Sequence, residues 1–511
     1  MQLGGTPMTK MPELYACIYA REFPVQALLR LRPDIRSQGC VALEGEPPLQ
    51  TVCSLNPRAR ALGAEHGMTR VELDTLPPLH VLTRARKQEE GARTALLECG
   101  GTFSPRVEDR STDSAFIAVI DIAGTDKLFG APDQLAAILL RRVQVLGISA
   151  VAAVSSNFHV AVCLAKGLSQ KSRIQVVPRG GEQNALGSLP LTVLDLSEYH
   201  AETFALWGIN SLGMLANLPE RELVARMGQE GRRLRQLARG ESPHLFQPLE
   251  PAFALEERIE LDSPVELLDS LMFVAGVMLE QLVLRAESRL VALACVTIAL
   301  SLEGGATHSR TVRPALPSND RHLWLKLLHL DLEGHPPPAA ILSLTLTAEP
   351  GSTSKVQLGL FSPQMPEPGR LDITLARIAK IVGEGCVGRA VLRDTHHPEG
   401  FRMERFDVPS NEPRETPAAF TNAVLRALRP AESVHLTLTA RGPERFRFRQ
   451  EDYIVERAFG PWEAKGEWWN SGAWGREQWD LVARCDNGSV LYGCLVRDLM
   501  LNRWQMVGLY D

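Results

Sequence analysis

Few side chains in this sequence have the type and spacing that metal or nucleotide chemistry requires. The sequence contains no G-x-x-x-x-G-K-[ST] phosphate loop, and no G-x-G-x-x-G motif follows a strand-like segment. His396 and His397 stand together, but no cysteine or carboxylate cluster accompanies them, which disfavours a zinc site. Asp113 and Asp121 could share a metal only through a sharp bend, because they are eight positions apart around an expected strand. We therefore predict no cofactor and no metal site.

The most specific short motif is the pentapeptide Gln-Leu-Gly-Leu-Phe at residues 357–361. It matches Q-L-x-L-F, the peptide that binds the bacterial sliding clamp, at every defined position. In such a peptide the glutamine amide hydrogen-bonds at the rim of a pocket, and the last two apolar side chains fill a groove. An ordinary strand is the alternative, but the flanking Gly351–Ser354 and Pro363 favour an exposed segment. The predicted clamp-binding residues are Gln357, Leu358, Leu360 and Phe361.

Arginines gather near the end of a segment that we expect to be helical. On one helix they could contact successive DNA phosphates, which would position the protein without reading the base sequence. The alternative is a solvated helix face that Glu230 and Glu241 partly balance. The formal net charge is −5, so any DNA-binding surface must be a local patch, with weak and salt-sensitive binding. The arginines are Arg232, Arg233, Arg235 and Arg239.

Length and composition are typical of an ordinary globular protein with several domains. The chain has 511 residues, of which 45% are hydrophobic and 23% are charged. Its nine cysteines are scattered and form no C-x-x-C pair, which fits a reducing compartment and disfavours a zinc ribbon. We find neither a signal peptide nor an apolar run long enough to cross a membrane. We expect a cytoplasmic protein.

The elements that must position these residues alternate between strands and helices. We expect three buried strands at 13–20, 115–122 and 148–154, and two helices at 133–146 and 157–167. Short helices separated by glycine are expected over 190–240, because glycine is favoured at helix ends. After a linker, a compact unit of strands and two helices is expected up to residue 349. The predicted fold class is α+β and multidomain.

This order of elements resembles the Y-family DNA polymerases, whose chains run through palm, fingers, palm, thumb and little finger. Asn56–Gly63 resembles their fingers motif Y-E-A-R-x-x-G, although proline replaces the tyrosine, and Arg60 takes the place of the triphosphate-contacting arginine. Ile120–Gly124 resembles the end of the second palm motif. Ser155–Asn157 and Lys166 resemble the serine-rich turn and the phosphate-contacting lysine of the third. The resemblance implies that Arg60 and Lys166 are candidate phosphate or DNA contacts.

The resemblance also implies a domain plan with a C-terminal α/β extension. The expected parts are a palm-like domain at 11–30 and 96–188, a fingers-like domain at 31–95, a helical thumb-like module at 189–245, a little-finger-like domain at 250–349, a linker with the clamp-binding motif at 350–370, and a C-terminal partner-binding region at 371–511.

The carboxylates that Y-family chemistry requires are missing. Polymerases of this kind hold two Mg²⁺ ions about 4 Å apart with hard carboxylate ligands. In our preferred alignment the four ligand positions are Cys17, Tyr19, Phe116 and Ile117. A second alignment keeps Asp113 but places Ser114 where a glutamate belongs. Because at least three of the four carboxylates are absent under either alignment, we expect the protein not to be an enzyme.

The C-terminal part resembles the ImuB family, a catalytically inactive branch of the Y-family. The similar features include Val382–Gly385, Asp394–His396 and a tryptophan-rich stretch that begins at Gly460–Trp462. This resemblance implies an adaptor of the ImuA/ImuB mutasome, which tethers an error-prone translesion synthesis complex to the sliding clamp (beta subunit) during SOS DNA damage tolerance. The implied partners are the clamp, an ImuA-like RecA-related protein, an error-prone C-family DNA polymerase and DNA. The alternative is an active but divergent Y-family translesion polymerase that uses Asp113 and Asp121.

Overall fold

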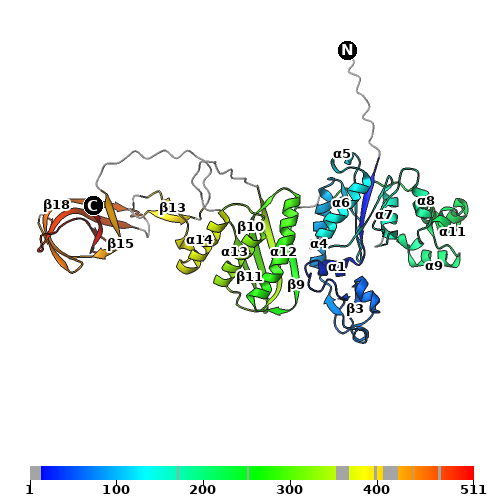
Figure 1. The fold of residues 1–511 in the computed structure, drawn as a ribbon, viewed down its shortest axis with the longest axis horizontal. Coiled ribbons are helices and arrows are strands. Elements are labelled where there is room, and N and C mark those ends of the chain that lie inside the picture. The colour runs from blue at the N-terminus through cyan, green and yellow to red at the C-terminus, as the bar shows by residue number, and fades with distance from the viewer. Residues whose placement is uncertain are drawn as a thin grey trace, which may run out of the picture. The chain divides into compact units, whose positions relative to one another are not determined.

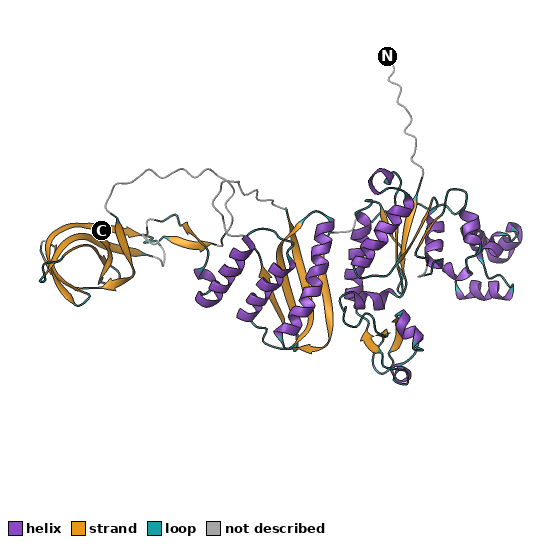
Figure 2. Cartoon of the chain, viewed as in Figure 1, coloured by secondary structure: helices purple, strands orange, loops and turns teal. Residues whose placement is uncertain are grey.

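The chain forms two compact units, residues 1–381 and residues 382–511. The computed structural model describes residues 13–169, 172–249, 253–352, 368–395, 397, 400–404, 406, 424–440, 442–469 and 473–510. Helices and sheets occur together in the first unit, and strands dominate the second (Figure 2). The predicted α+β multidomain class is confirmed. Within the described ranges, no helix is long and apolar enough to cross a membrane.

The first unit contains a five-stranded sheet in the order β5-β6-β1-β7-β8. β1 (Tyr15–Ala20) lies in the centre and is antiparallel to β6 (Phe116–Asp121) and β7 (Val151–Ser155). β5 (Val107–Asp109) and β8 (Ile174–Val176) form the edges. The three central strands are apolar at nearly every position because both faces of the sheet are covered. The three predicted strands are therefore confirmed in one sheet.

Alternate side chains of these strands enter two separate cores. α4 (Arg86–Gly101) and α6 (Pro132–Val145) cover the face that carries Ile18 and Ile120. α7 (Phe158–Gly167) covers the opposite face, which carries Cys17. Figure 1 shows α6 and α7 on the two sides of the central strand β1. This split follows from the strand period of two, which points successive side chains to opposite faces.

Two smaller parts extend from this sheet. α1 (Phe23–Arg30) leads into a three-stranded sheet in the order β3-β2-β4, with two short helices. Its elements are β2 (Cys40–Glu44), β3 (Thr51–Leu55), α2 (Pro57–Ala61), α3 (Arg70–Leu73) and β4 (His80–Thr83). A helical part packs on the α7 side of the central sheet, as its shared hydrophobic core shows. Its helices are α8 (Glu182–Gly187), α9 (Glu198–Leu206), α10 (Leu212–Ala216) and α11 (Glu220–Arg239).

The four-stranded module, defined here as residues 253–352, completes most of the first unit. Its antiparallel sheet has the order β11-β10-β12-β9, and two helices contribute to one core with it. The elements are β9 (Leu255–Val265), α12 (Leu268–Ser288), β10 (Ala292–Leu302), β11 (Thr307–Val312), α13 (Arg321–Gly334) and β12 (Ile341–Gly351). α14 (Pro368–Val382) contacts this module, because Lys380 Nζ lies 2.6 Å from Glu333 Oε1 on α13.

The second unit is a seven-stranded sheet that closes on itself. β15 (Leu425–Ser433) and β16 (His435–Thr439) stand at opposite ends of the strand order, yet only Val434 separates them in the chain. β15 pairs with β21 (Arg503–Tyr510), and β16 pairs with β17 (Gly442–Phe448). One continuous stretch of chain therefore joins both ends of the sheet (Figure 1). The remaining strands are β18 (Glu451–Gly466), β19 (Trp474–Cys485) and β20 (Val490–Asp498), and a small hairpin of β13 (Arg389–Leu392) and β14 (Phe401–Glu404) precedes them.

Candidate functional site

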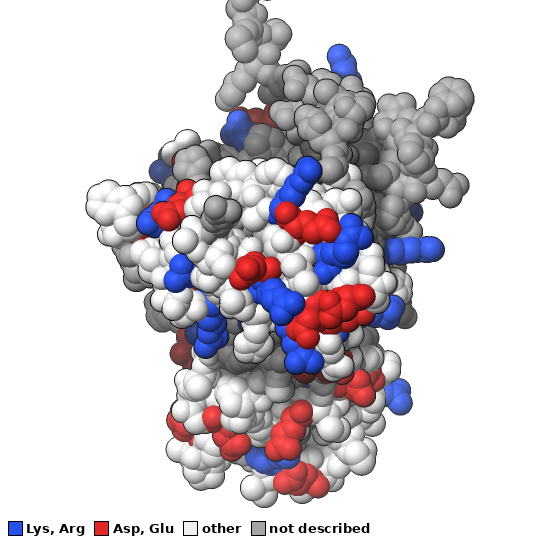
Figure 3. Space-filling model, turned by 90° about the vertical axis from the view of Figure 1, so that its left-hand side faces the viewer, with Lys and Arg blue, Asp and Glu red and all other residues white. Residues whose placement is uncertain are grey.

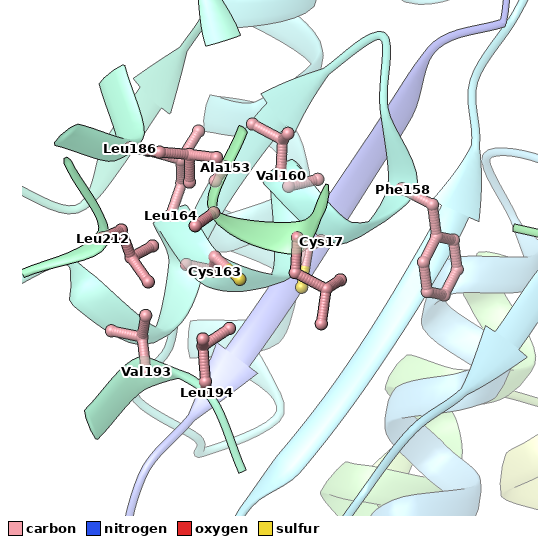
Figure 4. Close-up of a cluster of buried hydrophobic side chains, with 14 of the residues drawn as sticks. Cys17, Ala153, Phe158, Val160, Cys163, Leu164, Leu186, Val193, Leu194 and Leu212 are labelled. Carbon is pink, nitrogen blue, oxygen red and sulfur yellow. The ribbon is translucent and has the colours of Figure 1, made fainter. Parts of the chain in front are cut away.

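The first of the four degenerate ligand positions, Cys17, lies in an apolar core. Its side chain on β1 is surrounded by Ala153, Cys163 and Leu164 (Figure 4). Burial raises the pKa of the Cys17 thiol, so the side chain stays protonated and uncharged. Because Mg²⁺ prefers charged or polar oxygen ligands, a neutral buried thiol is unsuited to hold it.

The other three positions divide between the two faces of the sheet. Tyr19 on β1 lies opposite Ile117 on β6, and both pack against the core that contains Cys17. Phe116 packs on the other face, where its ring centroid lies 5.6 Å from that of Phe23. The four side chains therefore do not converge on one point, and each is packed against apolar neighbours.

Asp113, the carboxylate that the second alignment keeps, is held by two arginines. Arg84 Nη1 lies 2.8 Å from Asp113 Oδ2, and Arg86 pairs with the other carboxylate oxygen. The buried Arg84 also contacts Glu44 and Glu89, each at 2.8 Å. Hydrogen bonds from Arg84, followed by those from Arg86, hold the pKa of Asp113 below its ordinary value. Both oxygens of Asp113 thus belong to an ion cluster formed by these five residues.

Asp121 lies at the far end of β6 and has structural partners of its own. Its Oδ1 accepts a hydrogen bond of 3.1 Å from the backbone N–H of Ala123, and its Oδ2 lies 3.3 Å from Arg106 Nε. Asp113 precedes β6, whose six residues span about 20 Å at roughly 3.3 Å per residue. Two-metal chemistry needs ions about 4 Å apart, so these two carboxylates cannot share a site. Across the described ranges, no group of three or more His, Cys, Asp or Glu residues could hold a metal.

Arg60, the candidate triphosphate contact, is paired with a carboxylate of the chain itself. It lies on α2, which begins where Asn56 accepts a hydrogen bond of 2.8 Å from Ala59 N. Arg60 Nη2 lies 2.7 Å from Glu22 Oε1. The other oxygen of Glu22 accepts hydrogen bonds from Ser54 Oγ at 3.0 Å and from the backbone N–H of Leu55 at 3.1 Å.

Glu22 reaches these donors from a left-handed backbone conformation. Its φ of 51° is uncommon for a residue with a Cβ atom and stores strain. His66 Nε2 lies 2.9 Å from the same Glu22 oxygen that contacts Arg60. Two cationic or polar side chains, a hydroxyl and a backbone N–H thus surround one internal carboxylate, in the arrangement of an anion-binding site.

Lys166, the second candidate phosphate contact, is also paired internally. It lies in the last turn of α7, and its Nζ lies 2.8 and 2.9 Å from the two carboxylate oxygens of Asp195. Sequence reasoning missed both Glu22 and Asp195. Glu22 is 38 positions from Arg60, and Asp195 is 29 positions from Lys166, so no local pattern could have revealed the pairs.

The arginine cluster of α11 is largely neutralised. Arg232 and Arg235 share Glu220, and Arg233 and Arg239 pair with Glu230 and Glu241 respectively. The expected balance by Glu230 and Glu241 is therefore present, and Glu220 adds a third carboxylate. Figure 3 shows a different face, the left-hand side of Figure 1 with the second unit, and there acidic and basic side chains are interspersed without an extended basic surface.

The clamp-type pentapeptide cannot be placed in this fold. Gln357, Leu358, Leu360 and Phe361 all lie outside the described residues. The described chain stops at Ser352, just after β12, and resumes at Pro368, where α14 begins. His396 also lies outside, and the ring of its neighbour His397 packs edge-on against Trp474 at 5.1 Å.

One part of the chain matches a known protein family. Residues 18–166, which contain the end of β1 and all of β6 and β7, match the model of the impB/mucB/samB family. The chain is 24% identical to Protein ImuB of Caulobacter vibrioides over 409 residues, which are 78% of this chain and 87% of that protein. The chain is therefore similar to ImuB over most of its length, and one part of it matches the impB/mucB/samB family.

Proteins named DNA polymerase IV are also similar to part of this chain. The chain is 30% identical to a DNA polymerase IV of Desulfatibacillum aliphaticivorans over 242 residues, which are 46% of this chain. That match spans 59% of the polymerase's own length. The crystal structure of DinB from Sulfolobus solfataricus aligns with 66% of this chain and 98% of its own, at 15% identity and a TM-score of 0.39.

Proposed function

We propose that this protein is a non-catalytic Y-family polymerase-like adaptor in SOS DNA damage tolerance. In this proposal it tethers an error-prone translesion synthesis complex to the sliding clamp in the cytoplasm. The observation that carries the proposal is the apolar packing of β1 and β6, where Cys17, Tyr19, Phe116 and Ile117 leave no carboxylate site for two metals. The internal pairing of Arg60 and Lys166 supports it, because both candidate phosphate contacts are already neutralised.

The domain plan is part of the same proposal. The five-stranded sheet would be the palm, the three-stranded sheet the fingers, the α8–α11 part the thumb, and the four-stranded module the little finger. The closed sheet of the second unit would contact partners, which we propose to be an ImuA-like RecA-related protein and an error-prone C-family polymerase. Similarity to ImuB over 78% of the chain supports this assignment. DNA contact would be weak because the α11 arginines are paired.

The clamp-binding segment would supply the tether. The side chains of Gln357, Leu360 and Phe361 match the anchor positions of a clamp-binding peptide. Replacing all three by alanine should weaken binding to purified clamp at least about 100-fold, because a single hot-spot anchor contributes roughly 2 kcal/mol or more. Ser362→Ala with Gln364→Ala is the matched control, since it changes neighbouring residues outside the pentapeptide. Equal clamp affinity in the triple variant and the control would exclude the tether.

An active but divergent polymerase is the second candidate, and the 30% identity to a DNA polymerase IV is the observation that favours it. Primer extension with Mg²⁺ or Mn²⁺ on the purified chain separates the two. We expect no template-dependent incorporation above that of a sample without protein. Incorporation that Asp113→Asn abolishes would establish the second candidate.

A further inference from the structure

The four-stranded module meets the rest of the first unit through buried charges. Arg30 on α1 and Glu98 on α4 face Glu257 on β9 and Arg285 on α12. None of these four side chains is more than 5% exposed. Two arginines and two glutamates make the cluster electrically neutral, so each buried charge has an opposite charge beside it.

Arg285 lies at the centre of this cluster. Its Nε and Nη2 each lie 2.9 Å from one oxygen of Glu98, which is a bidentate pair, and its Nη1 lies 2.9 Å from Glu257 Oε1. Arg30 Nη1 lies 3.2 Å from the same Glu257 oxygen. Burial by itself lowers the pKa of Arg285, but the neighbouring carboxylates of Glu257 and Glu98 raise it above its ordinary value. The guanidinium is therefore held in its charged form.

Apolar packing accompanies the charges. Leu31, the residue that follows α1, is buried in the hydrophobic core of the four-stranded module together with Leu255 and Leu282. The module thus takes a side chain from outside its own sequence into its core. If the module only made a loose surface contact with α1, the Leu31 side chain would remain exposed at the edge of that contact.

Residues 244–249, which lead into the module, are also held by hydrogen bonds. Glu108 on β5 accepts a hydrogen bond of 2.8 Å from the backbone N–H of Gln247, and His244 Nε2 lies 2.8 Å from the same oxygen. The His244 ring stacks on Phe158 with 3.5 Å between centroids. The backbone N–H of Leu249 donates to Val107 O at 2.7 Å. On the other side of residues 250–252, the backbone N–H of Ala254 donates to Glu98 Oε1 at 3.3 Å.

We infer that this charge cluster locks the four-stranded module onto α1 and α4, while β5 holds the segment that leads into it, so that the module does not swing freely on its linker. The linker is fixed at both of its described ends, and Glu98 contributes to the second fixed end and to the charge cluster. The lock holds the module in one orientation relative to the five-stranded sheet. All of these contacts lie within the first unit, and they are independent of the adaptor function.

Hydrogen exchange on the full-length chain tests the lock. Glu98→Gln keeps the shape of the side chain but removes the charge that holds Arg285. We expect exchange in the peptides that contain Leu249 and Ala254 to become about tenfold faster or more, while α13 inside the module keeps its protection. Unchanged exchange in those peptides would overturn the lock.

Asp331→Asn is the matched control, because Asp331 forms a similar bidentate pair with Arg310 entirely within the module, at 2.7 and 2.8 Å. It should leave the peptides around Leu249 and Ala254 unchanged. Hydrogen exchange of the unmodified chain also tests the lock, and this measurement remains possible if the Glu98→Gln variant does not fold. The Ala254 amide of the unmodified chain should exchange as slowly as the amides of α12, and rapid exchange there would also overturn the lock.

Discussion

One carboxylate oxygen of Glu22 lies 2.7 Å from Nη2 of Arg60, and this pair neutralises the side chain that family resemblance assigns to triphosphate. His66, Ser54 and the Leu55 backbone N–H complete the surroundings of the same carboxylate. The left-handed backbone at Glu22 indicates that the chain accepts local strain to hold it there. The site therefore already contains an anion, and an external phosphate would have to displace it.

Glu22→Gln should partly restore anion binding. The change removes the negative charge and keeps the size of the side chain, so Arg60 becomes available to an added anion. Because Arg60 is an exposed partner, the gain should be modest, about threefold to tenfold in affinity for inorganic triphosphate, or roughly 0.7–1.4 kcal/mol. Isothermal titration calorimetry at low salt would measure it. Glu46→Gln, an exposed glutamate in the β2–β3 turn, should leave the affinity unchanged.

Glu89→Gln should destabilise the first unit. Glu89 makes a bidentate pair with the buried Arg84, whose Nε and Nη2 lie 2.8 and 2.9 Å from its two oxygens. Glutamine has no charge and only one acceptor oxygen, so the buried guanidinium loses a charged partner. The free energy of unfolding should fall by about 2–3 kcal/mol. Urea unfolding of the purified chain would report the change. Its neighbour Glu90 is exposed, and Glu90→Gln should change the unfolding free energy by less than about 0.5 kcal/mol.

The strands of the central sheet could be predicted from the sequence, but the contents of the site could not. β6 has five buried residues out of six because the sheet is covered on both faces. An unbroken apolar run in the sequence predicts such a buried strand. The Arg84 cluster gave no such signal. Glu44 is 40 positions from Arg84 and Asp113 is 29, and only the fold brings them together.

The closed sheet of the second unit illustrates the same limit. Its strands alternate polar and apolar residues, and a pattern of that kind identifies strands without giving their order. Closure depends on Val434, which ends pairing with β21 and is followed at once by pairing with β17. The tryptophans likewise have mixed roles that composition cannot separate, since Trp479 is buried in the core while Trp462 and Trp468 are exposed.

Acid should weaken the first unit through the Arg84 cluster. Hydrogen bonds from Arg86 and Arg84 lower the pKa of Glu44 below its ordinary value of 4.5, although burial opposes this shift. Hydrogen bonds from Arg84 and Arg86 likewise lower the pKa of Asp113 below its ordinary value of 3.8. A carboxylate whose pKa is lower in the folded state stabilises the fold above its unfolded pKa, and this contribution disappears as pH falls through the folded pKa. Stability should therefore decrease as pH falls below about 4.5.

Arg86→Gln isolates the contribution of this cluster to the acid response. Arg86 is largely exposed and pairs with both Glu44 and Asp113, so its removal should bring their pKa values closer to the ordinary ones. Urea unfolding at a series of pH values between 3 and 7 would show a shallower loss of stability in the variant. Parallel curves for the variant and the unmodified chain would show that other carboxylates control the acid response.

Gly442→Ala should destabilise the second unit through a clash with Trp479. A Cβ atom at Gly442 would lie 2.8 Å from Trp479 Cη2, and the backbone there has a φ of 119°. Gly488 is the matched control, because its φ of 86° is also unfavourable for alanine but nothing lies within 4 Å of its added Cβ. Gly488→Ala should cost about 1–2 kcal/mol for the backbone alone, and Gly442→Ala about 1–3 kcal/mol more for the clash. Denaturant unfolding followed by tryptophan fluorescence would measure both, because most tryptophans of the chain lie in this unit. Equal losses in the two variants would mean that the Trp479 ring moves aside without cost.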